Sequence, residues 1–181
     1  FFYDQHLAVI KSVSIKVLSE KDRIFESTLE DKSVSLVSGI IPKYSQELKE
    51  GLCKTIDFIG VNASYLNNCS SNVPGSIVSS ILREVLKTDD WKIWADLNNL
   101  LPLLAEADPD EFLLIVEDIL YKPSGAFAAF FSQDKNQFRE LESYMFGLYR
   151  ALETLAWSKD YLQRSLIALA GLAHLYPKEW I

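Results

Sequence analysis

Residues 108–121 read DPDEFLLIVEDILY and form the clearest helix signal in the chain. Asp108 suits the N-cap, Pro109 suits the first helical position, and Glu111 at the third position can reach back to the cap. The apolar residues that follow predict a helix that ends before the sequence Pro-Ser-Gly at 123–125. This stretch therefore predicts a short capped helix with an apolar face.

Similar helical patterns, with apolar residues three or four apart, occur on both sides of this stretch. They predict helices over residues 3–20, 46–66, 76–87, 137–157 and 159–176, a helical turn over 126–131, and a helix around Trp91 that Pro102 kinks or splits. Ser45 and Ser158 suit the N-caps of the helices that follow them, and Thr88 or Asp89 suits the helix around Trp91. Residues 21–44 show no pattern strong enough to assign.

The joint at residues 157–159 is so short that the last two helices must form an antiparallel hairpin. The last helix is apolar around most of its circumference, which predicts burial on most sides. Stacked antiparallel helix pairs are the units of an α-solenoid. We therefore expect an all-α, HEAT/TPR-like solenoid segment over residues 45–176 and a less regular part over 1–44, although no fixed repeat period is visible.

The composition of the 181-residue chain excludes several classes of protein. Hydrophobic residues make up 49% of it, with only 7 glycines and 6 prolines, which excludes a disordered or collagen-like chain. The net charge of −7 argues against a nucleic-acid partner. No apolar stretch is long enough to span a membrane. Two cysteines are typical of a protein in a reducing cytoplasm. The length predicts a single helical domain, and the start at Phe1 predicts that this domain is cut from a longer protein.

The residues that carry reactive chemistry are few. The glycines form no phosphate-binding motif and no G-x-S-x-G elbow. His174 is a candidate general base, and either His6 or His174 is a candidate partner for Cys53 or Cys69. Nothing in the spacing supports such a pair, so we expect structural roles for all four. We assign no catalytic residue, no cofactor and no metal.

Two groups of side chains suggest a ligand site. The first is a run of carboxylates without a basic residue, at Glu106, Asp108, Asp110, Glu111, Glu117 and Asp118. It predicts either a site for a cation or basic partner, or a helix start stabilised by acids with the last two on a solvated face. We favour the second interpretation, because capping and the helix dipole account for most of the acids and calcium-loop spacing is absent.

The second group is aromatic. Trp91, Trp94 and Trp157 suit either a ligand groove or the core, and we expect the core because the first two share a side with Leu97 and Leu101. An enclosed cavity formed by the first two tryptophans and the patch at residues 127–131 would instead favour a small apolar ligand.

Four phrases carry a resemblance to a known class of protein. They are SQELKEGLCKTI at 45–56, WKIWADL at 91–97, LPLLAEADPDEFL at 101–113 and LETLAWSKDYL at 152–162. In this order they resemble the helical-repeat region of large multidomain bacterial proteins, including STAND-type NTPase or NLR-like antiphage defence proteins. In those proteins an effector and an NTPase domain precede a helical region that senses a target.

The resemblance covers about residues 45–176 and implies a non-enzymatic scaffold or sensor segment. Its partner would be another protein or other domains of the same chain. The protein would act in the cytoplasm, in antiviral defence. No catalytic residue is implied, because the segment lacks a nucleotide motif. Two alternatives stay open: a helical bundle that binds a small apolar ligand, and an enzyme of unrecognised type that uses His174 or the acids between Glu106 and Asp118.

Overall fold

The computed structural model describes residues 2–21, 42–132 and 145–175, and within them all regular secondary structure is helical. The α-helices are α1 (Asp4–Leu18), α3 (Gln46–Val61), α4 (Val73–Leu86), α5 (Trp91–Asp96), α6 (Leu101–Ala107), α7 (Pro109–Leu120), α8 (Ala126–Phe131), α10 (Phe146–Ala156) and α11 (Leu162–Leu175). Short 3-10 turns follow α3 at Ala63–Tyr65 and precede α6 at Asn98–Leu100. The predicted all-α class is confirmed. The unassigned residues 22–41, the first part of the helix predicted over 137–157, and residue 176 lie outside the described residues.

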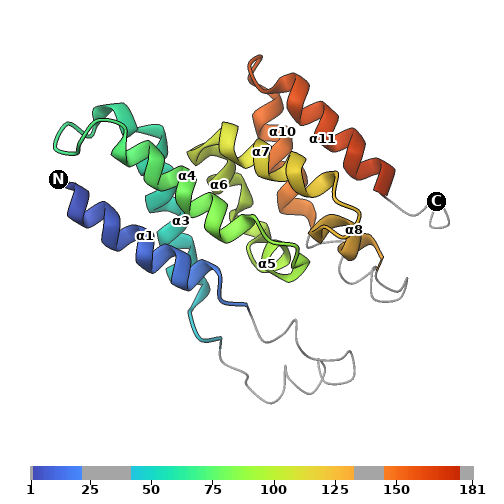
Figure 1. Ribbon diagram of the computed structural model, residues 1–181, viewed down its shortest axis with the longest axis horizontal. Helices are drawn as coiled ribbons and strands as arrows, with labels where there is room; N and C mark the ends of the chain where they lie inside the picture. The colour runs from blue at the N-terminus through green and yellow to red at the C-terminus, as the bar shows by residue number, and fades with distance from the viewer. Residues whose placement is uncertain (1, 22–41, 133–144, 176–181) are drawn as a thin grey trace.

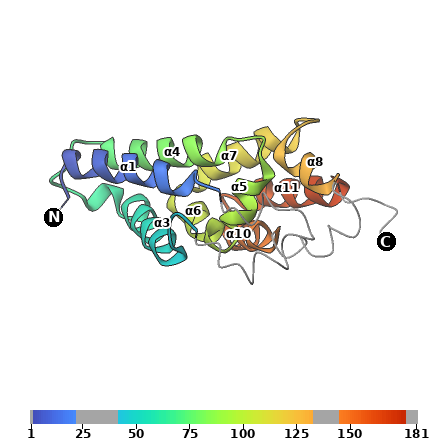
Figure 2. The ribbon, with the colours of Figure 1, turned by 90° about the horizontal axis from the view of Figure 1, so that it is seen from below.

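The helices form two layers, and the chain passes back and forth between them (Figures 1 and 2). The upper layer in Figure 2 contains α1, α4, α7 and α11, each of which contacts the next. The lower layer contains α3, α6 and α10, with α6 in contact with both of its neighbours. Helices α5 and α8 contact each other and lie beside the C-terminal ends of α4 and α7.

Neighbouring helices within the upper layer run parallel (Figure 1). Between α4 and α7 the contacting partners advance together along both helices, in the pairs Ser79–Asp108, Arg83–Glu111 and Lys87–Asp118. A chain that returns through the other layer before each new helix produces this parallel order.

Two glycines set the spacing of the lower layer. A Cβ atom added at Gly60 of α3 would overlap the backbone carbonyl of Ala107 at the end of α6. A Cβ atom added at Gly147 of α10 would overlap the carbonyl of Asn98, just before α6. The Gly147 amide also donates to the Asn98 Oδ1 at 2.6 Å. Both outer helices of this layer therefore touch the central segment backbone to backbone.

The N-caps follow the sequence in part. Ser45 and Asp108 cap α3 and α7 as predicted, each accepting a backbone N–H three residues on. Asp90, rather than Thr88 or Asp89, caps α5, because its carboxylate is the one that reaches the Lys92 N–H.

Several helix boundaries and one burial prediction are wrong. The helix around Trp91 is split as expected, but the break lies at residues 97–100, and Pro102 stands in the first turn of α6. Helix α3 ends five residues before the predicted end, and α11 begins three residues late. Helix α11 was expected to be buried on most sides, but Leu162, Leu166 and Ile167 are 43%, 53% and 47% exposed.

Gly60→Ala should destabilise the fold by several kcal/mol, because the added methyl group meets rigid backbone at Ala107. Gly51→Ala in the same helix is the matched control. No atom lies near an added Cβ there, so the substitution should raise stability by up to about 1 kcal/mol through helix propensity. Urea unfolding of both variants measures the difference, and equal stabilities would contradict the close backbone contact.

Candidate functional site

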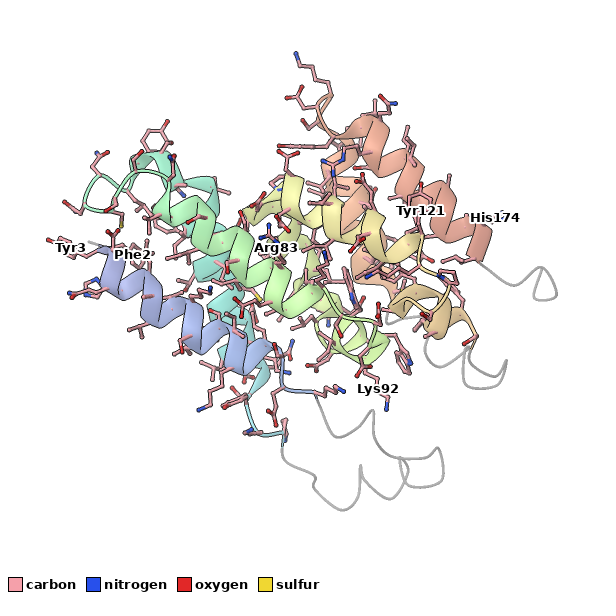
Figure 3. The ribbon with its side chains drawn as sticks, viewed as in Figure 1. Phe2, Tyr3, Arg83, Lys92, Tyr121 and His174 are labelled. Atoms are coloured by element: carbon pink, nitrogen blue, oxygen red, sulfur yellow. The ribbon has the colours of Figure 1, made fainter. Side chains whose placement is uncertain are left out.

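The acidic stretch of α6 and α7 joins the helices of the upper layer to one another. Arg83 of α4 binds Glu111 through two hydrogen bonds, Nε to Oε1 at 3.0 Å and Nη2 to Oε2 at 2.5 Å. Glu111 is therefore held by α4 and does not complete the predicted capping box. The pKa of Arg83 is raised by this hydrogen bond and by the nearby carboxylate charge. Figure 3 shows Arg83 on the side of α4 that faces α7.

Helix α11 is joined to α7 in the same way. Arg164 donates to both oxygens of Glu117, at 2.8 and 3.0 Å, and to Asp110 at 3.0 Å. Elsewhere in the layer Lys87 pairs with Asp118 at 3.2 Å, and Lys11 of α1 pairs with Glu84 of α4 at 3.1 Å. We call these contacts the interhelix ion pairs. Each step from α1 to α4, α7 and α11 has at least one of them.

Most side chains of the acidic stretch have a partner within the protein. Asp108 caps α7 as expected, and its second oxygen accepts from the Ser79 hydroxyl at 2.5 Å. The predicted solvated face is wrong for Glu117, because Arg164 covers it. Among the described residues no three His, Cys, Asp or Glu side chains gather closely enough to hold a metal ion. Most of the acidic side chains therefore bind cationic or hydroxyl groups of the protein itself.

A shallow hollow of about 360 Å³ lies over these contacts, between α4, α7 and α11. Its lining consists of Ser79, Asp108, Asp110, Glu111, Leu114 and Arg164. Each of these polar side chains already has a partner within the protein. A second hollow, of about 790 Å³, lies in the segment from Ala63 to Ser76, and its lining mixes serine and asparagine with apolar residues such as Leu66 and Pro74. Asp4 fixes this segment by accepting hydrogen bonds from the Ser70 amide and hydroxyl.

The histidines lie at opposite ends of the molecule. His6 stands in the first turn of α1, where its Nδ1 accepts the Tyr3 N–H at 3.3 Å and its ring packs against Tyr3. His174 is exposed in the last turn of α11, far from Tyr3 (Figure 3). Cys69 donates to the Phe2 carbonyl at 3.4 Å rather than to a histidine. Cys53 is fully buried in α3, and burial raises its pKa to about 12 against the opposing effect of Lys49.

The tryptophans divide into two groups. Trp94 is buried and packs against Phe127 and Phe112, with ring centroids 4.9 and 6.3 Å apart, which confirms its core role. Trp91 is partly buried and packs edge-on against Phe130 at 5.6 Å. These rings fill space against one another, and they line neither of the two hollows described above.

Trp157 contradicts the core prediction, because 87% of it is exposed. It lies directly after α10, on the helix face that also carries Phe146, Arg150 and Glu153 at spacings of four, three and four residues. Phe146 is 58% exposed, and the Arg150 guanidinium lies 5.9 Å from its ring centroid. We call these four residues the α10 surface.

The sequence contains a signal for this surface in the periodicity of α10. Leu148, Leu152 and Leu155 are buried on the opposite side of α10, so the remaining face must point outward. The two aromatic residues on that face flank two charged ones, as on an exposed surface.

A further property concerns membranes. Over residues 2–21, 42–132 and 145–175, no helix combines the length and the apolar character needed to cross a bilayer.

Acid should weaken the interhelix ion pairs. Hydrogen bonds from Lys11 and Lys87 hold the pKa values of Glu84 and Asp118 below their usual 4.5 and 3.8. Both carboxylates therefore bind fewer protons in the folded state than in the unfolded state. Their contribution to the stability of the fold is complete above the usual pKa values, and it is lost as the pH falls through the lower pKa values of the folded state. The thermal midpoint should drop between about pH 5 and pH 3, and less in high salt because the pairs are partly exposed.

The double variant Glu84→Gln/Asp118→Asn is the control for the acid effect. It should melt slightly below the wild type at pH 7 and show a shallower drop below pH 5. Parallel pH profiles for the two proteins would contradict the assignment.

Cys53 should resist thiol reagents in the folded protein. With a pKa of about 12, only about one thiol in ten thousand is ionised at pH 8, and burial blocks access to it. In the variant Cys69→Ser, Ellman's reagent should release no colour until denaturant is added, and then one equivalent. Rapid release from the folded variant would show that Cys53 is accessible.

Comparisons with known proteins assign no family to this arrangement. No family model, no curated protein and no solved structure matches the chain. A proposal for its function therefore rests on its own residues and their geometry.

Proposed function

We propose that the chain is an α-solenoid segment of the HEAT or TPR type and acts as a non-enzymatic scaffold or sensor for another protein. The two-layer arrangement supports this proposal. Helices of the upper layer run parallel, each contacts the next helix in that layer, and the chain returns through the other layer. Arrays of this kind bind proteins over extended faces through many small contacts.

The spacing between contacting residues also supports a repeat. Gly60 and Ala107 are 47 residues apart, and Asn98 and Gly147 are 49 apart, in successive steps of the lower layer. HEAT and armadillo repeats are about 40–47 residues long. The step from Ser79 to Asp108 in the upper layer is only 29 residues, which agrees with a degenerate repeat.

The single observation that carries the binding role is the α10 surface. Trp157 and Phe146 are both more than half exposed, and Arg150 and Glu153 accompany them. Tryptophan and arginine are enriched among residues that dominate binding energy in protein interfaces, and exposed aromatic patches mark such sites. The same layer exposes Phe58 and Val61 on α3, at 51% and 61%.

The resemblance to bacterial STAND-type and NLR-like proteins supports a role for this binding segment in antiphage defence. There the segment is the target-sensing part of a larger cytoplasmic antiphage protein. The α10 surface then contacts either the target or another domain of the same chain. Both partners are proteins, which fits a surface that combines aromatic and charged side chains.

The double variant Phe146→Asp/Trp157→Asp tests this role in the full-length protein of the source organism. Affinity capture with quantitative mass spectrometry should recover a partner with the wild type and at least about tenfold less of it with the variant, because each residue is a candidate hot spot. Crosslinking within the same samples reports contacts to other domains of the chain.

The matched control is Tyr121→Asp, at the end of α7 in the other layer, where the side chain is 70% exposed (Figure 3). It should retain the partner and the crosslinks. If the double variant folds and recovers the same proteins and crosslinks as the wild type, the α10 surface does not mediate binding.

A further inference from the structure

The residues of the α10 surface follow a symmetric order along the helix. An aromatic, a basic, an acidic and an aromatic residue stand at spacings of four, three and four, at Phe146, Arg150, Glu153 and Trp157. Trp157 keeps helical dihedral angles, and at 3.6 residues per turn all four lie within about 60° of one another around the axis. In the reverse direction the spacings and the aromatic ends are the same, and the two charges exchange places. The surface is therefore complementary to its own reverse.

The α10 surface lies on the outer face of the lower layer. Gly147, about 100° to one side of Phe146, packs against the segment before α6. Tyr149 lies about 60° to the other side of Phe146 and is partly buried. A further helix of this layer would pack on the Tyr149 side, so the α10 surface is an outer face of the layer rather than its open end (Figure 2).

We propose that the α10 surface of one copy pairs with the α10 surface of a second copy, as an antiparallel, two-fold symmetric dimer. The two-fold axis passes midway between Arg150 and Glu153. Antiparallel pairing places residues at equal distances from this axis opposite each other. Phe146 then faces Trp157 of the second copy, and Arg150 faces Glu153 of the second copy. This inference rests on the proposed function, because a copy paired in this way does not offer its α10 surface to another protein.

The charges of the surface favour a second copy as the occupant. The Arg150 Nε and the Glu153 Oε2 lie 3.9 Å apart, and the two side chains are 60% and 65% exposed, so each can accept a second opposite charge. A complementary helix must carry an acid opposite Arg150, a base opposite Glu153 and an apolar residue beyond each of them. The α10 helix of a second copy meets all of these requirements at one register.

The symmetry also determines the size and the strength of the assembly. An isologous contact uses the same surface in both copies, so association stops at the dimer. Two aromatic rings and two charged side chains from each copy cover less than the roughly 1,200 Å² of a standard interface, so the dimer is weak and reversible. The α10 surface is thus masked at high concentration of the chain and is released when the dimer dissociates.

Sedimentation velocity of the full chain between about 10 µM and 1 mM measures this association. The average mass of the wild type should rise toward that of a dimer and not beyond it. Trp157→Ala should weaken the dimer at least about tenfold, because each dimer loses two tryptophan contacts.

Charge reversal makes the test specific to the proposed register. Arg150→Glu alone and Glu153→Arg alone each place like charges opposite one another at both symmetry-related positions, so each should weaken the dimer at least about tenfold. An equimolar mixture of these two variants should form a heterodimer. The double variant Arg150→Glu/Glu153→Arg restores opposite charges and should dimerise like the wild type.

Lys54→Glu is the matched control, since its side chain is 63% exposed on α3 and its substitution changes the net charge by the same amount as Arg150→Glu. It should dimerise like the wild type, and circular dichroism should show equal helix content for all variants. The proposal is overturned by a wild type that stays monomeric at 1 mM or grows beyond a dimer. A single reversal that dimerises like the wild type, or a double variant that stays monomeric, overturns it equally.

Affinity capture with the same variants separates this proposal from the proposed function. The double variant should regain the dimer but not the captured protein, because another protein keeps its own charges. If the wild type is monomeric and the single reversals still reduce capture, only the dimer is wrong. If the dimer follows the charges and capture is unchanged in every variant, only the proposed binding role is wrong.

Discussion

The two layers depend on the backbone contacts that α3 and α10 make with the segment around α6. Gly60 meets Ala107 and Gly147 meets Asn98 without an intervening side chain, which fixes the position of both outer helices along the central one. The buried Lys49 ammonium strengthens this register, because it binds Asp96 and also the Glu20 carbonyl after α1. Helices of both layers are therefore positioned against the same central segment.

The upper layer is held together by a different interaction. Its helices carry basic residues on one side of each contact and acidic residues on the other, as at Arg83–Glu111 and Arg164–Glu117. Such pairs contribute modest stability at the surface, but opposite charges at matched positions oppose slippage of one helix along its neighbour. The acidic excess of α6 and α7 thus has a structural use, which composition alone does not reveal.

Local signals in the sequence predicted the local structure well, since a cap such as Ser45 or Asp108 needs only the next three residues. They did not predict tertiary partners. Glu111 has the right spacing for a capping box, but Arg83, 28 residues earlier, binds it. Periodicity likewise shows which residues share a face of a helix, but not whether another helix covers that face. Trp157 and the outer side of α11 were misjudged for this reason.

The exposed apolar residues are of two chemical kinds, and this difference separates their roles. On the α10 surface, two aromatic rings flank Arg150 and Glu153, so a partner must satisfy charges as well as cover apolar area, which suits reversible recognition of a different protein. The exposed side of α11 carries aliphatic and small side chains at Leu162, Leu166, Ala170 and Ala173, whereas the exposed Lys16 of α1 lies on the same side as Val9 and Val13. Because the α10 surface and the exposed side of α11 lie on different helices, occupation of one leaves the other accessible.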